Sequence, residues 1–129
     1  MQYVYPVILC PDDDKIGITV PDLKGCHTFG HDTADALIMA KDAIEGWLCH
    51  AEDEGWDIPK ASKTFPLNKD ETITLVVADT TEYRKATDTR AIKKTLSIPS
   101  WLNRQAEKAN APFSQILQEG LKNYLKIAN

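Results

Sequence analysis

Residues 16–55 carry the pattern that decides the fold, and they read IGITVPDLKGCHTFGHDTADALIMAKDAIEGWLCHAEDEG. Ile16, Ile18 and Val20 alternate with smaller residues, which is the period of a half-buried β-strand. After a turn and a short strand over residues 26–30, apolar residues recur at helical spacing. They are Leu37, Ala40, Ile44, Trp47, Leu48 and Ala51. The stretch therefore predicts two strands followed by a helix of about 20 residues.

Both ends of this helix are marked. Asp32 or Thr33 can serve as the N-cap, and Asp35 places a negative charge in the first turn, where the helix dipole favours it. Gly55 offers a C-terminal stop.

Two further strands complete a small sheet. Tyr3 to Cys10 is rich in aromatic and β-branched residues, and a polar turn at residues 12–14 leads into the strand at Ile16. Residues 72–78 are apolar nearly throughout, so we expect this strand inside the sheet with both faces covered. The predicted order is β-β-β-α-β, a meander with one helix packed on it.

Charge divides the chain into two parts. Residues 1–83 hold 6 Lys/Arg against 16 Asp/Glu, a net of −10, whereas residues 84–129 hold 9 against 3, a net of +6. A basic surface attracts phosphate and an acidic one repels it, so only the second part suits nucleic acid. We predict an α+β protein with domains at 1–84 and 91–129, joined by a solvated linker at 85–90.

The basic part predicts one strand and two helices. Over residues 91–99, successive side chains alternate between two faces, as in a β-strand. Ser100 can then cap a helix that runs to about Ala109. After Pro112, a second helix carries an apolar stripe of Phe113, Ile116, Leu117, Gly120, Leu121, Tyr124 and Leu125. So small a unit cannot bury this stripe alone, which predicts a homodimer.

Two such strands side by side form an antiparallel ribbon, which fits the major groove of double-stranded DNA. The outward face of the ribbon would present Lys93, Thr95 and Ser97 to base edges. Phosphates would be held at the start of the second helix by the backbone amides of Phe113 and Ser114 and by the Ser114 hydroxyl. The pattern is compatible with a dimer or with a tetramer built from dimers.

The sequence predicts no catalytic site, cofactor or metal. Phosphate-binding loops and the H-E-x-x-H and G-x-S-x-G patterns are absent from the 129 residues. Three widely spaced cysteines, Cys10, Cys26 and Cys49, are expected to be buried thiols. An active nuclease remains an alternative: it would need converging carboxylates that bind Mg²⁺, and it would depend on Asp22 or Asp32.

Membrane and export signals are also missing from the sequence. No apolar run approaches the roughly 20 residues that a membrane-spanning helix needs. The first residues do not form a basic stretch followed by an apolar region. We therefore expect a cytoplasmic protein with no membrane partner.

Several motifs resemble the N-terminal domain of HicB antitoxins over residues 3–84. They are YPVIL at 5–9, GITVPDLKGC at 17–26, TADAL at 33–37, AKDAI at 40–44 and VVAD at 76–79, which runs on to Tyr83-Arg84. The resemblance implies a partial ribonuclease-H-like fold that lacks a working active site. It also implies a partner, a small basic HicA-type toxin that cleaves mRNA. An acidic domain suits that role, because its carboxylates can occupy the cationic positions that phosphates would.

The segment LSIPSWLNRQAEKANAPFSQILQEGLKNYL, residues 96–125, resembles the ribbon-helix-helix family of Arc and MetJ-like repressors. It does so in the version found at the C-terminus of many HicB antitoxins, apart from Pro112, where that family often has a Ser or Thr cap. The two resemblances together imply an antitoxin that neutralises its toxin and represses its own operon by binding operator DNA. The alternative is a ligand-responsive ribbon-helix-helix repressor without a toxin partner.

Candidate toxin contacts lie at both ends of the predicted sheet. Strand reversals should bring the turn at 12–14 and the pair His31-Asp32 to one end, with Asp22 at the other. Trp47 and Trp56 could anchor an interface or could be buried against the sheet. The candidates are Asp12, Asp13, Asp14, Asp22, His31, Asp32 and Trp47.

Overall fold

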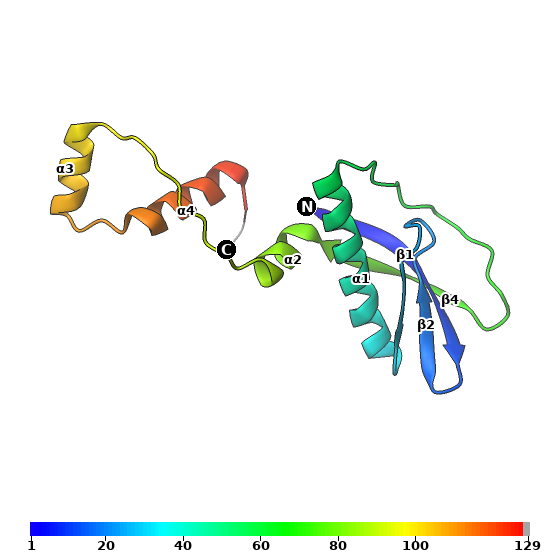
Figure 1. Ribbon diagram of the computed structural model, residues 1–129. Coiled ribbons are helices and arrows are strands. Elements are labelled where there is room, and N and C mark those ends of the chain that lie inside the picture. The colour runs from blue at the N-terminus through cyan, green and yellow to red at the C-terminus, as the bar shows by residue number, and fades with distance from the viewer. Residues whose placement is uncertain (128–129) are drawn as a thin grey trace. The chain divides into compact units, whose positions relative to one another are not determined.

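A computed structural model describes residues 1–127 and divides the chain into two compact units, with the boundary between Arg90 and Ala91 (Figure 1). Unit 1, residues 1–90, is the acidic part, and unit 2 begins at residue 91. The elements in chain order are β1 (Gln2–Asp12), β2 (Lys15–Thr19), β3 (His27–Gly30), α1 (Thr33–Glu54), β4 (Thr72–Asp79), α2 (Thr80–Thr87), α3 (Ser100–Lys108) and α4 (Phe113–Leu125).

The four strands of unit 1 form one antiparallel sheet in the order β3-β2-β1-β4. β1 and β2 make the predicted hairpin, in which Asp12 lies opposite Lys15. Asp13, in the turn between them, has a positive φ of 50°, a conformation that aspartate tolerates better than most residues. The predicted β-β-β-α-β meander is confirmed.

Helix α1 begins and ends where its local signals predict. The Asp32 side chain, as N-cap, accepts a hydrogen bond of 2.8 Å from the Asp35 backbone N–H. The Asp35 carboxylate in turn accepts one of 2.8 Å from the His31 backbone N–H. Gly55 closes the helix in the left-handed conformation, with φ 72°.

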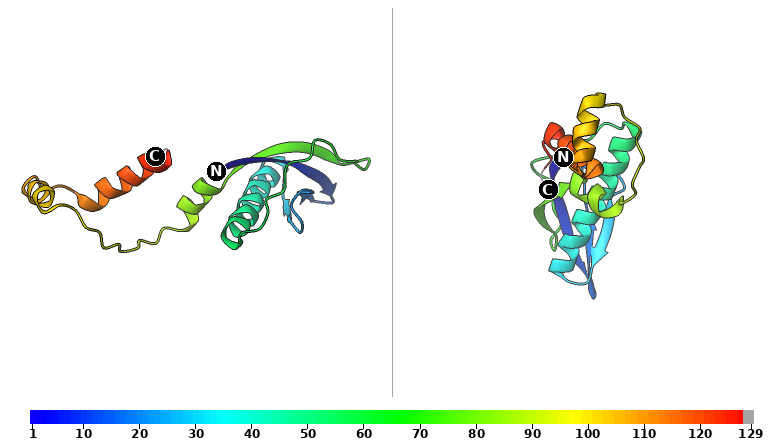
Figure 2. Two further views of the ribbon diagram at one scale, coloured as in Figure 1. Left: turned by 90° about the horizontal axis from the view of Figure 1, so that it is seen from above. Right: turned by 90° about the vertical axis from the view of Figure 1, so that its left-hand side faces the viewer.

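The core of unit 1 lies between α1 and one face of the sheet (Figure 2). Alternate side chains of β1, namely Tyr5, Val7 and Leu9, are buried in it. The helix contributes a stripe with small residues at its start, Ala36, Ala40, Ile44, Leu48 and Ala51. Because these residues are small, the helix start approaches β3 closely. A Cβ atom on Gly30 would lie 2.5 Å from the Ala36 Cα, so only glycine fits there.

The prediction that both faces of β4 are covered is wrong. β4 is an edge strand, and Leu75 and Val77 on its outer face are 68% and 52% exposed. Only Val76 and Ala78, on the face toward α1, are buried. An apolar run indicates a strand, but the coverage of its two faces depends on the elements that pack on the sheet, and here α1 covers only one face.

Residues 85–87 were expected in the linker and instead form the last turn of α2. The Asp79 side chain caps this helix by accepting from the backbone N–H groups of Thr81 and Glu82. Arg84 ties the helix to α1 through ion pairs with Glu52 at 3.1 Å and Asp53 at 3.0 Å. These contacts are long-range in the sequence, so local composition did not reveal the helix.

Two cysteine thiols are buried and one is not. Cys26 and Cys49 are buried as predicted, and burial is the main cause that raises the pKa of each thiol. Cys10 is exposed, which contradicts the prediction. It belongs to the alternate set of β1 side chains that points away from the core.

Unit 2 contains the two predicted helices but not the predicted strand. Residues 91–99 form no secondary structure in the single chain. A strand needs a neighbour for its backbone hydrogen bonds, and one copy of unit 2 supplies none. Ser100 is also not the cap: it is the first residue of α3, and Pro99 occupies the N-cap position without a side-chain hydrogen bond.

Candidate functional site

The antiparallel register separates the acidic residues of unit 1 into two ends, as the sequence predicts. Ile16 pairs with Gly30, so the β1–β2 turn and the β3–α1 junction lie at one end, which we call the hairpin end. Thr19 pairs with His27, so the β2–β3 turn that holds Asp22 lies at the opposite end, which we call the loop end.

At the hairpin end, the three turn carboxylates Asp12, Asp13 and Asp14 are exposed. Asp32 is occupied as the cap of α1, and the backbone of His31 is bonded to Asp35. The His31 ring packs edge-on against Phe29, with ring centroids 6.3 Å apart. The Lys15 ammonium lies 5.2 Å from the Phe29 ring centroid, a cation–π arrangement within the same chain.

At the loop end, Asp22 holds the chain that follows α1. Its carboxylate accepts hydrogen bonds from the Ser62 backbone N–H at 2.9 Å and from the Ser62 hydroxyl at 2.6 Å. The neighbouring Lys24 carbonyl accepts a hydrogen bond of 3.1 Å from the Trp47 indole. These contacts fix the β2–β3 turn against α1 and against the segment that leaves it.

An aromatic cluster stands at the same end. Trp56 lies edge-on to Trp47, with centroids 6.1 Å apart, and edge-on to His50, with centroids 4.9 Å apart. Trp47 is half-buried and packs against the core, whereas Trp56 is 51% exposed. Sequence reasoning singled out both tryptophans but missed His50, although the three-residue spacing of 47 and 50 places both on one side of α1.

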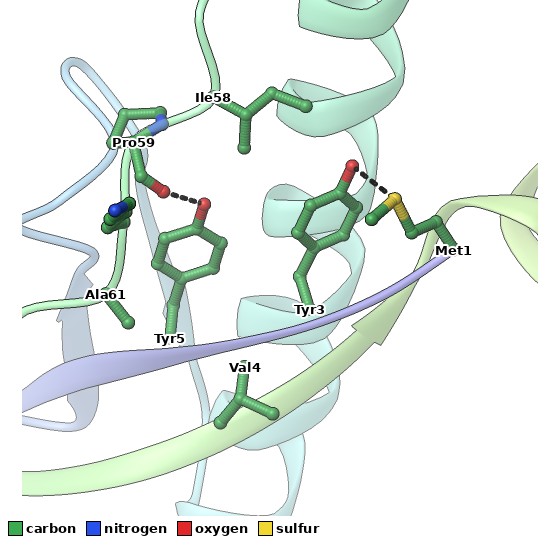
Figure 3. Close-up of a pocket in the computed structure, with 8 residues that line it drawn as sticks. Met1, Tyr3, Val4, Tyr5, Ile58, Pro59 and Ala61 are labelled. Carbon is green, nitrogen blue, oxygen red and sulfur yellow. Dashed lines mark hydrogen bonds between the residues drawn. The ribbon is translucent and has the colours of Figure 1, made fainter.

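A hollow of about 450 Å³ lies beside β1 (Figure 3). Tyr3 and Tyr5 stand side by side in it, with centroids 6.4 Å apart, opposite the segment that contains Ile58 and Pro59. The Tyr5 hydroxyl donates a hydrogen bond to the Pro59 carbonyl. The lining is largely apolar, which suits packing or binding.

A polar network joins β1, α1 and α2. Glu52 accepts hydrogen bonds from the Tyr3 hydroxyl at 2.9 Å, from Thr80 at 3.1 Å and from Arg84 at 3.1 Å. Burial raises the pKa of Glu52, but these hydrogen bonds outweigh it, so the pKa lies below its ordinary value of 4.5. Burial and the bond to Glu52 raise the pKa of Tyr3 to about 12. The network is structural, because each member is occupied by another.

The two carboxylates on which a nuclease was expected to depend do not converge. Asp22 and Asp32 lie at opposite ends of the sheet, and each holds a backbone amide of unit 1. Within residues 1–127, no three His, Cys, Asp or Glu side chains are grouped so that they could hold a metal ion. The helices among those residues include none whose length and apolarity would let it cross a bilayer.

In unit 2, the predicted DNA contacts lie on two segments. Lys93, Thr95 and Ser97 are exposed on the extended segment before α3, and Phe113 and Ser114 are the first two residues of α4. α4 has Pro112 at its N-cap position and no side-chain cap, so its first backbone N–H groups donate to no capping side chain.

Neither α3 nor α4 buries a single residue in the part of unit 2 that the structure describes. The apolar stripe is instead exposed throughout: Trp101, Leu102, Phe113, Ile116, Leu117, Leu121, Tyr124 and Leu125.

Comparison with known proteins identifies the family. The model for the HicB-like antitoxin of bacterial toxin-antitoxin systems matches residues 5–126. The chain belongs to this family of antitoxins. The HicB-like match extends across the boundary between the two units and covers the exposed helices of unit 2 as well as the sheet.

Proteins similar to this HicB-like chain include a phage protein and chains of two solved structures. An uncharacterized 14.9 kDa protein from the rep-hol intergenic region of Haemophilus phage HP1 is 26% identical over 104 residues, covering 77% of this chain and 75% of that protein. A chain of a toxin-antitoxin complex from Streptococcus pneumoniae has a TM-score of 0.60 at 21% identity, covering 96% and 99% of the two chains. The antitoxin HicB of Burkholderia pseudomallei has a TM-score of 0.52 at 22% identity, covering 98% of each. These two likenesses show the mixed α and β fold.

Proposed function

We propose that this HicB-like antitoxin neutralises a HicA-type ribonuclease toxin through unit 1 and represses its own operon through a ribbon-helix-helix dimer of unit 2. The observation that carries the proposal is the exposed apolar stripe of α3 and α4. Each large apolar side chain gains about 1.5–3 kcal/mol when it is buried. A stripe this long requires a cover, and a second copy of the same stripe provides one.

A second copy also explains the extended segment before α3. Its backbone groups would pair with the same segment of the partner and complete an antiparallel ribbon. Ile92, Leu96 and Ile98 would then face the helices, and Lys93, Thr95 and Ser97 would face DNA bases. The uncapped start of α4, at Phe113 and Ser114, would hold a phosphate.

Unit 1 has the charge that a toxin-binding domain needs. Residues 1–83 have a net charge of −10, so they attract a basic RNA-binding protein and repel RNA and DNA. Acidic surface is present at both ends of the sheet: at Asp12, Asp13 and Asp14 on the hairpin end, and around Asp22 and Trp47 on the loop end. An mRNA ribonuclease and an operator both act in the bacterial cytoplasm, where we place the protein.

Operator binding is tested by gel shift with the DNA upstream of the operon and the full-length protein. We expect Lys93→Ala with Thr95→Ala to lose discrimination between operator and unrelated duplex, and affinity to fall steeply with salt. Lys60→Ala, which removes a cation from unit 1, serves as the control and should leave binding unchanged. A wild-type protein that is monomeric and binds no upstream duplex would contradict this half of the proposal.

Toxin neutralisation is tested by co-expression with the small basic protein of the adjacent reading frame. We expect the two proteins to co-purify and the pair to lose the RNA-cleaving activity of the toxin alone. Full cleavage in the presence of excess antitoxin would contradict this half.

A further inference from the structure

Unit 1 exposes one aromatic ring at each end of the sheet. Phe29 at the hairpin end and Trp56 at the loop end are both 51% exposed. Both also have a histidine ring packed edge-on against them, His31 and His50 respectively. They differ in their charged surroundings, and that difference distinguishes the two ends.

The Phe29 ring already has a cation. Lys15 lies across the β2–β3 pair and places its ammonium 5.2 Å from the ring centroid. An incoming cation would have to displace this one, and the exchange would gain little. Although its turn is acidic, the hairpin end therefore offers no free aromatic face.

The Trp56 ring packs against two other rings and has no such cation among residues 1–127. The left-handed cap at Gly55 sets the direction of the chain, and the Trp56 backbone N–H bonds to the Ala51 carbonyl at 2.9 Å. Trp47, itself fixed by the Lys24 carbonyl, and His50 then both pack edge-on against the indole. A ring that is already ordered loses little side-chain entropy when a partner binds.

Two exposed carboxylates, Glu54 and Asp57, flank Trp56 in the sequence. Glu54 follows His50 by four residues along α1, and Asp57 follows Trp56 directly. Both are exposed, and neither forms an ion pair with the residues that the structure describes. Glu52 and Asp53, by contrast, are engaged by Arg84. An indole face beside free carboxylates attracts a guanidinium or ammonium group through both its ring and its charges.

We propose that Trp56, held by Trp47 and His50 and flanked by Glu54 and Asp57, receives an arginine or lysine side chain of the toxin. This inference rests on the proposed function and adds to it the surface that is used. It selects the loop end of the sheet over the hairpin end, a choice that the sequence left open. It also assigns the indole a central role, since tryptophan and arginine are the residues that most often dominate binding energy at interfaces.

The test measures the Kd between full-length antitoxin variants and the toxin of the adjacent reading frame, with the toxin carrying an inactivating substitution so that it can be produced. Trp56→Ala should weaken binding by about tenfold or more, the range of a residue that dominates an interface. Phe29→Ala is the matched control, because its ring is equally exposed at the other end, and it should change Kd less than about threefold. Trp56→Phe keeps an aromatic ring that attracts a cation less strongly than an indole does, so its Kd should lie between those of the wild type and Trp56→Ala.

The charges are tested separately. Glu54→Gln with Asp57→Asn should slow association and reduce its dependence on salt, whereas Asp12→Asn with Asp14→Asn at the hairpin end should do so less. Double-mutant cycles that combine Trp56→Ala with each Arg→Ala or Lys→Ala variant of the toxin measure the coupling in binding free energy. One arginine or lysine of the toxin should be strongly coupled to Trp56.

The outcomes separate this inference from the proposed function. If wild-type antitoxin does not bind the toxin, the proposed function fails. If the wild type binds and both Trp56→Ala and Trp56→Phe bind equally well, the docking surface is wrong while toxin binding stands. If Phe29→Ala weakens binding more than Trp56→Ala, the hairpin end is the docking surface and the inference is overturned.

Discussion

The Asp22 carboxylate accepts hydrogen bonds from both donors of Ser62, the backbone N–H at 2.9 Å and the hydroxyl at 2.6 Å. The two residues are 40 positions apart, so the contact closes a long segment of chain over the loop end of the sheet. Asp22 is a candidate toxin contact by sequence, but in the structure its oxygens organise the fold. It fixes the segment that follows Trp56, and its oxygens are already occupied by Ser62.

Removal of this contact should cost stability. Asp22→Ala leaves two donors of Ser62 without their acceptor, and we expect a loss of about 1 kcal/mol in the free energy of unfolding, because both groups remain reachable by water. Urea unfolding followed by tryptophan fluorescence measures the change. Asp12→Ala, which removes an exposed carboxylate from the hairpin end, should change the free energy by less than about 0.5 kcal/mol. Equal effects of the two variants would contradict this role for Asp22.

Gly30 is required by the close approach of α1 to β3. A Cβ atom there would lie 2.5 Å from the Ala36 Cα and 2.9 Å from the Asp35 carbonyl carbon, and backbone cannot give way as a side-chain tip does. We expect Gly30→Ala to destabilise unit 1 by about 2 kcal/mol or more. Gly17→Ala is the control, since its Cβ would make an ordinary contact of 3.5 Å with the Cys10 carbonyl oxygen. A urea midpoint for Gly30→Ala that matches this control would refute the explanation.

Local chemistry predicted α1 and the hairpin well, because their determinants lie within a few residues of one another. Asp32 and Gly55 mark the ends of α1 regardless of the rest of the fold. The exposure of β4 and the existence of α2 depend on distant partners, namely the packing of α1 on only one face of the sheet and the contact of Arg84 with Glu52. Such information is not contained in the composition of either segment.

The candidate site divides in the same way. The pairing of strands placed Asp12–Asp14 and His31 at one end and Asp22 at the other, and it needed only the alternation of the strands. The choice between the ends depends on two contacts, the Lys15 ammonium over Phe29 and the packing of Trp56 against Trp47. The sequence does not reveal these contacts, because the residues meet only when the chain is folded. In unit 2, the segment 91–99 has the alternation of a strand but lacks the neighbour that would make it one.

Acid should weaken unit 1 through Glu52. The pKa of this carboxyl is lowered in the folded state, so it contributes stability above its ordinary pKa of 4.5 and loses this contribution as pH falls through the folded value. We expect Glu52→Gln to be less stable than wild type at pH 7 and to show a shallower decline below pH 4.5. Thermal unfolding at a series of pH values measures both. Parallel stability curves for the two proteins would show that Glu52 does not contribute to acid sensitivity.

Alkaline pH should act through Tyr3. Burial and the hydrogen bond to Glu52 raise its pKa from 10.0 to about 12, so its contribution to stability is complete below pH 10 and is lost as pH rises toward 12. Burial also raises the pKa of Tyr5 and of Tyr83, so ultraviolet titration of the phenol groups should show a late step in the wild type whose size Tyr3→Phe reduces. A late step of the same size in Tyr3→Phe and in the wild type would contradict this prediction.

Self-association and DNA binding should be separable in unit 2. Leu117 belongs to the exposed apolar stripe of α4, and Leu117→Lys would place a charge in the centre of the proposed dimer interface. We expect this variant to be monomeric by light scattering and to lose operator binding, because one copy cannot form the ribbon. Gln118→Lys adds the same charge at an exposed neighbouring position outside the stripe and should remain dimeric.

Lys93→Ala should also remain dimeric while its operator affinity falls by about tenfold, since a good base contact contributes about 1–3 kcal/mol of discrimination. Unit 1 is unchanged in all three variants, so each should still bind the toxin. A Leu117→Lys protein that remains dimeric would show that the stripe is covered by something other than a second copy.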